Sequence, residues 1–119
     1  MAVALGGLLG SLARHALSSW TRGFQPGFVP LATLGVNVIG CFAIGWLFRW
    51  SLDRQLLNQW WEVGLRVGVL GGLTTFSTFG LETVNAWHDR PALALAIVAA
   101  HVCLGLLAVV LGMTVATWR

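Results

Sequence analysis

The sequence predicts an all-α integral membrane protein with four transmembrane helices, the third of which is broken near the middle of the membrane. The chain is 57% hydrophobic and only 9% charged, with a mean hydropathy of +0.81, whereas a soluble domain carries about 25% charged residues. Four apolar segments are each long enough to cross a bilayer as a helix, which takes about 20 residues. A stretch of glycine and hydroxyl residues interrupts the third segment.

We expect a single transmembrane domain over residues 1–119, with spans at about 2–20, 29–48, 61–86 and 91–117. The first span is the weakest because Arg14 and His15 lie inside it, and no charged residue interrupts the second. The third carries Arg66 near its start. The fourth should begin at Pro91 with Asp89 as its N-cap, since proline suits the first turn of a helix.

The break is predicted from residues 71–79, which read Gly-Gly-Leu-Thr-Thr-Phe-Ser-Thr-Phe. Glycine loosens a helix, and the four hydroxyl side chains need hydrogen-bond partners that lipid does not supply. Phe76 and Phe79 lie three residues apart and so share one helix face. Because non-helical backbone in a bilayer is tolerated only beside protein or water, a broken polar helix of this kind is a candidate ion site.

The arginines do not fix an orientation in the membrane. With spans placed as above, Arg49, Arg54, Arg66 and Arg119 lie on the side of the termini, and Arg14, Arg22 and Arg90 lie on the other. The two sides therefore carry nearly equal numbers of arginines, and the positive-inside rule predicts no orientation. Insertion in both directions, followed by antiparallel dimerisation, would explain the balance, and so would side assignments that are wrong by a residue or two.

Glycine pairs at four-residue spacing predict close helix packing. The pairs are Gly6 with Gly10, Gly64 with Gly68, and Gly68 with Gly72. Small residues at this spacing let helix backbones approach one another in a membrane. Four short spans enclose little interior, so a pore is most easily built between copies of the chain. We therefore expect an oligomer.

Several classes of function are disfavoured. The chain contains no Ser/His/Asp set in a plausible site, no carboxylate pair and no phosphate-binding loop, so we expect no enzyme activity. Its net charge of +3 comes from scattered arginines, which make no basic face long enough to follow a nucleic acid. A small proton-coupled multidrug exporter is the alternative transporter class, but it needs a carboxylate in its first span, where this chain has none.

Four single residues allow two interpretations each. Asn37 either holds helices together or lines a pore, and the polar cluster at similar depth in the third span favours the pore. His101 is either a hydrogen-bonded structural residue or a pore residue. Arg14 either reaches the membrane surface or attracts anions to a vestibule. Glu82 either pairs with an arginine or caps a helix, and the sequence does not decide.

The two phenylalanines suggest a small anion. An aromatic ring carries a positive edge, so two rings presented edge-on beside hydroxyl groups could hold an anion without binding it tightly. Conduction requires that balance between entry and escape.

These motifs resemble those of the Fluc/CrcB fluoride channels across nearly the whole chain. Residues 6–14, 35–40 and 71–79 carry the resemblance in the order that the family has them, followed by a fourth span that contains glycine. The resemblance implies a dual-topology antiparallel homodimer with two pores. It also implies passive, fluoride-selective export through a multi-pass protein of the prokaryotic inner (plasma) membrane.

The resemblance implies roles for particular residues. Phe76 and Phe79 would form an aromatic box around fluoride, and Asn37 would hydrogen-bond the ion. Ser77 and Thr78 would offer hydroxyl groups along the path, and Arg14 would serve the vestibule. The family also holds a structural sodium ion at the dimer centre, and its ligands here would be the backbone carbonyls of Gly71 and Thr74 from both copies.

The fourth span departs from the family pattern. Many relatives carry Tyr or Asn there, followed by Ser or Thr at four-residue intervals, whereas the matching positions here are His101, Gly105 and Val109. A shortened polar track is one interpretation, and a heterodimer with a paralogue is another. His101 could also make conduction depend on pH.

Overall fold

The computed structural model describes residues 1–21, 30–54 and 59–118. These residues are helical apart from short connections, and no strand occurs among them. In chain order the elements are α1 (Ala2–Thr21), α2 (Leu31–Arg54), α3 (Gln59–Val63), η2 (Gly64–Leu70), α4 (Gly71–Leu73), α5 (Phe76–Asp89) and α6 (Pro91–Thr117). The run from α3 to α4 is continuous, so the described residues form four helical rods, of which the third is interrupted before α5.

The helices cover the four apolar segments but differ from them at the ends. α2 continues past the predicted end at 48 as far as Arg54, and the predicted start at 29 lies outside the described residues. α6 begins at Pro91, as predicted. The prediction of Asp89 as its N-cap is wrong, because α5 extends through Asp89 and Arg90 alone separates the two helices. Arg90 (φ −145°, ψ 72°) is the cap residue and makes no side-chain capping bond.

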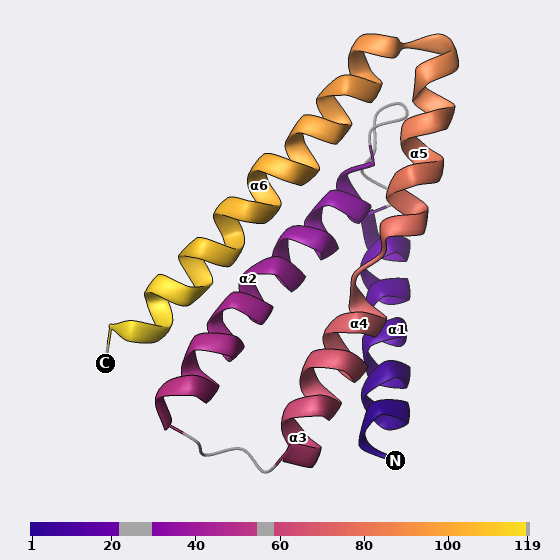
Figure 1. The fold of residues 1–119 in the computed structure, drawn as a ribbon. Helices are drawn as coiled ribbons and strands as arrows, with labels where there is room; N and C mark the ends of the chain where they lie inside the picture. Colours follow the sequence, from indigo (N-terminus) through magenta and orange to yellow (C-terminus); the bar gives the residue numbers. More distant parts are fainter. Residues whose placement is uncertain (22–29, 55–58, 119) are drawn as a thin grey trace.

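The four rods pack as two close pairs. α2 runs beside α6, and α1 runs beside η2 and α4 (Figure 1). α5 tilts away from the line of α4 and packs on α6, so it joins the two pairs at the end where α5 turns into α6. The interruption before α5 therefore lies where all four rods come together.

The glycine pairs allow close packing between helices of the same chain. A side chain added at Gly6 would meet the backbone carbonyl of Gly64, and one added at Gly10 would meet that of Val69. Gly68 and Gly72 face α1 in the same way. These contacts confirm that the glycine spacing predicts close helix approach, and they bring the backbone of α1 directly against the segment that leads to the break.

The described part of the chain has little buried interior and exposes many apolar side chains. The hydrophobic residues that are buried are mainly small, namely Val36, Leu47, Ala86, Ala94, Ile97 and Ala108. Many large apolar side chains are exposed on all four rods. Within the described residues, Leu31–Ser51 and Pro91–Thr117 are long and apolar enough to cross a membrane. An apolar exterior of this extent suits contact with lipid or with another chain.

Candidate ion-binding site

The helix interruption consists of two extended residues. Thr74 has φ −80° and ψ 156°, and Thr75 has φ −149° and ψ 116°, so both lie in the β region. The turns of η2 just before the interruption are wide π-helical turns, a form often found at functional sites. The backbone groups freed by the interruption need other partners if they are buried.

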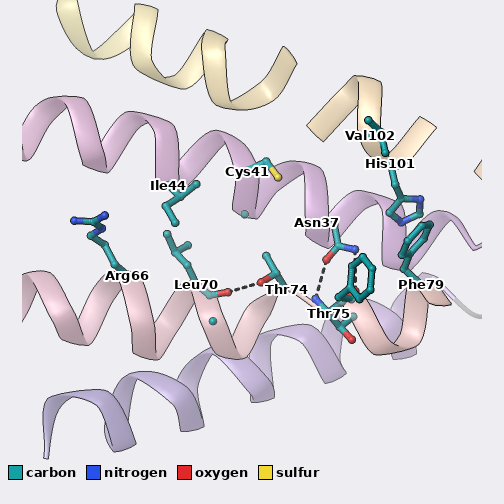
Figure 2. Close-up of a pocket in the computed structure, with 13 residues that line it drawn as sticks. Asn37, Cys41, Ile44, Arg66, Leu70, Thr74, Thr75, Phe79, His101 and Val102 are labelled. Carbon is teal, nitrogen blue, oxygen red and sulfur yellow. Dashed lines mark hydrogen bonds between the residues drawn. The ribbon is translucent and has the colours of Figure 1, made fainter. Parts of the chain in front are cut away.

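Asn37 of α2 supplies those partners for Thr75. The Asn37 side-chain amide donates to the Thr75 carbonyl at 3.0 Å, and the Thr75 N–H donates to Asn37 Oδ1 at 2.8 Å (Figure 2). One side chain therefore satisfies both backbone polar groups of an extended residue. In a regular helix the Thr75 N–H would donate to the carbonyl of Gly71, so this arrangement diverts the usual donor from the Gly71 oxygen.

The Thr75 side chain starts the next helix. Its hydroxyl accepts a hydrogen bond from the Thr78 N–H at 3.2 Å, which is an N-cap of α5. The same oxygen lies 2.9 Å from Thr78 Oγ1 and 3.4 Å from Ser77 Oγ. Thr75 is 8% exposed, one of the few buried polar residues in the described part of the chain. It was not among the predicted site residues, although it lies inside the motif.

An aromatic cavity of about 410 Å³ opens beside the interruption. Its walls come from α2, η2, α4, α5 and α6 (Figure 2). The predicted site residues that line it are Asn37, Gly71, Thr74, Phe76, Phe79 and His101, and the other lining residues are Gly40, Cys41, Ile44, Arg66, Leu70, Thr75 and Val102. The structure thus brings together residues from three separate stretches of sequence, 37–44, 66–79 and 101–102.

Three rings lie in series along this cavity. The centroids of Phe76 and Phe79 are 5.4 Å apart with an interplanar angle of 59°, so the rings are tilted against each other. The His101 ring of α6 lies 4.4 Å from Phe79 at an angle of 37°. Phe79 also packs against the buried cluster of α5 and α6, whereas Phe76 is 83% exposed in a single chain.

A polar cavity of about 320 Å³ lies on the other side of Thr75. Its walls are Ser11, Arg14, His15, Ser18, Thr33, Val36, Thr75 and Thr78. A guanidinium nitrogen of Arg14 donates to the Thr74 carbonyl at 3.4 Å, a long hydrogen bond that leaves the cation facing this space. Thr75 lines both cavities. The predicted residues Arg14 and Thr78 thus lie in the polar cavity, and Ser77 is exposed and lines neither.

Two carboxylates near the site interact with other side chains. Glu82 of α5 accepts a hydrogen bond from Thr33 at 2.7 Å, while its second oxygen is buried without a hydrogen-bond partner among the described residues. Of the two roles left open for Glu82, neither describes this contact. Glu62 pairs with Arg66 at 2.8 Å, one helical turn apart.

Any cation site near the interruption would use backbone oxygens. No group of three or more His, Cys, Asp or Glu side chains that could hold a metal occurs in the described part of the chain. The Thr75 N–H, which would donate to the Gly71 carbonyl in a regular helix, bonds Asn37 instead, and the Thr74 carbonyl accepts a long bond from Arg14. Carbonyls freed from helical bonding are the kind of ligand that unwound helices offer to hard monovalent cations.

Comparison with known proteins identifies the family. The sequence profile described as CrcB-like protein, Camphor Resistance (CrcB), matches residues 1–113. A Geobacter metallireducens protein named fluoride-specific ion channel FluC is 47% identical over 75% of this chain and 72% of its own length. Fluoride-specific ion channel FluC 2 of Symbiobacterium thermophilum is 40% identical over 98% of this chain and 97% of its own.

A third relative shows the same agreement over a long alignment. The Paracoccus denitrificans protein named fluoride-specific ion channel FluC is 45% identical over 95% of this chain and 90% of its own. These relatives are ion channels and not enzymes. With a family profile matched over nearly its full length, the chain belongs to the CrcB family.

Proposed function

We propose that this protein is a fluoride-selective passive ion channel that lets cytoplasmic fluoride leave the cell and so lowers its toxic concentration. The observation that carries the proposal is the arrangement at the interruption, where Asn37, Phe76 and Phe79 face one cavity in a chain related to proteins named fluoride-specific ion channels. Each part of that arrangement suits a small anion.

Asn37 would give the anion a fixed hydrogen-bond donor. A side-chain amide has two N–H groups, and the Thr75 carbonyl takes one of them. The second N–H remains for a ligand in the cavity. Because Asn37 is also held through its oxygen by the Thr75 N–H, the donor is already oriented before an ion arrives.

The two phenylalanine rings would complete the site without binding fluoride tightly. A tilted pair of rings turns a ring edge toward a shared space, and ring edges carry partial positive charge. This attraction is weaker than a full cation would exert, which lets an ion leave again. Fluoride, with its higher charge density, would gain more from the Asn37 donor than chloride would.

The polar cavity would serve as a vestibule. Arg14 brings a fixed positive charge to a space that also contains Thr78, and such a charge raises the local concentration of anions. Thr75 lines both cavities, and its hydroxyl contacts those of Ser77 and Thr78. A line of hydroxyl groups along the start of α5 would replace part of the ion's hydration shell between the two spaces.

We further propose that the channel is an antiparallel homodimer of four-span subunits inserted in the inner membrane in both orientations. Phe76 is 83% exposed in one chain, beside a cavity that it lines, so a second copy would enclose the anion site. The carbonyls of Gly71 and Thr74 from both copies would hold a sodium ion, which would neutralise the facing oxygens. A heterodimer with a paralogue is the alternative, since two relatives bear the name FluC 2.

A channel of this kind needs no energy source of its own. A membrane that is negative inside drives an anion outward by about 2.3 kcal/mol per charge for each 100 mV. Fluoride enters cells as neutral HF and ionises in the cytoplasm, where the anion is trapped until a pore releases it.

The test is fluoride flux from purified protein. Liposomes loaded with potassium fluoride are treated with valinomycin, and release is followed with a fluoride electrode, with chloride-loaded liposomes as the control. Fast fluoride release without chloride release supports the channel and shows that one gene product suffices. No fluoride release from folded dimer contradicts the homodimeric channel, and proton-driven uptake of a toxic cation would then favour the multidrug-exporter alternative.

A further inference from the structure

We propose that His101 admits fluoride to the aromatic cavity only when its imidazole is protonated, so that conduction falls as the pH rises. This inference rests on the proposed fluoride-channel function and concerns the same cavity.

The first nitrogen of His101 must carry a proton. Nδ1 lies 2.9 Å from the backbone carbonyl of Ile97, one turn earlier in α6. A carbonyl oxygen can only accept a hydrogen bond, so Nδ1 is the donor. The neutral ring then has its lone pair on Nε2, and only the positively charged ring has an N–H there.

The second nitrogen is buried and has no hydrogen-bond partner in the described part of the chain. His101 lines the aromatic cavity and its ring lies against Phe79 (Figure 2). Fluoride can only accept hydrogen bonds. A neutral His101 would therefore present a lone pair that repels the ion, whereas a charged His101 would present an N–H donor together with a positive charge.

The surroundings of the ring favour the charged form more than an apolar membrane interior would. Glu82 of α5 attracts His101 electrostatically and has one oxygen without a partner. The Phe79 ring is near enough for a cation–π attraction. These two contacts compensate part of the cost of placing a cation in the membrane.

The other titratable or charged groups that line the two cavities include Arg66, Cys41 and Arg14. Arg66 of η2 lines the cavity at the end away from His101 (Figure 2) and is paired with Glu62. Cys41 of α2 contributes a thiol. Arg14 of α1 lies in the polar cavity, across Thr75. Of these groups, Glu82 is the one with an electrostatic attraction to a charged His101.

The experiment measures fluoride efflux from liposomes with the same pH on both sides, from about pH 5.5 to 8, the interval in which histidine titrates. Protein-free liposomes at each pH give the leak of neutral HF, which is subtracted. We expect the wild-type rate to fall with rising pH, by up to about tenfold per pH unit above the midpoint, as for any path that requires one bound proton.

Substitutions test whether His101 is the source of the pH dependence. His101→Tyr and His101→Gln offer a neutral donor at every pH, so their rates should not change with pH. The matched control is His88→Gln, near the end of α5 and in neither cavity, which should keep the wild-type slope. His15→Gln, in the polar cavity, tests whether the vestibule histidine is the sensitive group instead. Each variant is first shown to be a folded dimer by gel filtration and circular dichroism.

The outcomes separate this inference from the proposed function. A wild-type rate that does not change with pH, or a slope that survives in both His101 variants, would overturn the role of His101 and leave the channel intact. A slope abolished by His15→Gln would also overturn it, because the sensitive group would then be in the vestibule. No fluoride flux from wild type or from His101→Tyr at any pH would contradict the channel itself.

Discussion

At the scale of single residues, the site depends on side chains that satisfy backbone groups as well as on those that face the cavity. Asn37 was predicted from its place in an apolar span, with helix bonding and pore lining as the two possibilities. The structure gives it both a lining position and two bonds to Thr75. Sequence indicated that an amide at this depth needs a partner, but its partner is a backbone group 38 residues away, which no local pattern specifies.

The phenylalanine rings give a prediction at this scale. Phe76→Ile and Phe79→Ile each replace a ring edge by an aliphatic surface of similar hydrophobicity, which removes the partial positive charge offered to an anion. We expect fluoride flux to fall by at least tenfold in each variant while the dimer remains folded. Liposome flux and gel filtration measure the two properties.

The matched control is Phe42→Ile, on α2, because Phe42 lines neither cavity. This variant should keep wild-type flux. If both Phe76→Ile and Phe79→Ile conduct as wild type does, the rings are packing residues and not part of the ion path.

At the scale of the helices, the sequence predicted the rods better than their ends. Long apolar runs with few charges located all four, and the composition of residues 71–79 located the interruption. The cap of α6 was predicted wrongly because only Arg90 separates α5 from α6, and hydrogen-bonding propensity at Asp89 could not reveal that the preceding helix would continue through it. Helix ends are set by the neighbouring elements as much as by local residues.

The start of α5 gives a second prediction. Thr75→Val removes the hydroxyl that accepts from the Thr78 N–H, and loss of an N-cap costs about 0.5–2 kcal/mol. Thr75→Ser keeps the hydroxyl and is the control. We expect Thr75→Val to lower both the unfolding free energy and fluoride flux, and Thr75→Ser to stay near wild type. Equal stability and flux in the two variants would show that this N-cap does not stabilise the extended backbone of the interruption.

The contact between α2 and α6 gives a third prediction. A methyl group added at Gly112 would meet the backbone carbonyl of Phe42, whereas one added at Gly105 would meet only Cys41 Sγ at 3.5 Å, an ordinary contact. Gly112→Ala should therefore lower the unfolding free energy by roughly 1–3 kcal/mol, the usual cost of overpacking, and Gly105→Ala should lower it by less. Detergent unfolding curves followed by circular dichroism measure both, and the reverse order would contradict the packing of α6 on α2.

At the scale of the whole molecule, the described part of a single chain encloses little. Few of its side chains are buried, and its aromatic cavity is lined by a largely exposed ring, Phe76. The four short spans predicted this shortage of interior, and with it an oligomer, because four short helices cannot enclose much volume. Which surfaces would meet in the proposed dimer depends on the shape of the assembled rods, which neither composition nor periodicity contains.

Sodium dependence is the prediction that belongs to this scale. The proposed cation ligands are the Gly71 and Thr74 carbonyls of both copies. Without the cation, the partial negative charges of these oxygens would lie near one another at the proposed interface, offset only by the long bonds from Arg14 to Thr74. We therefore expect dialysis into N-methylglucamine buffer, which supplies no small cation, to shift the dimer toward monomer in gel filtration and to reduce fluoride flux by several-fold. Returning sodium, but not further N-methylglucamine, should restore both; an equally stable and active dimer without sodium would show that the carbonyls at the interruption are satisfied by water or by protein groups of the partner copy.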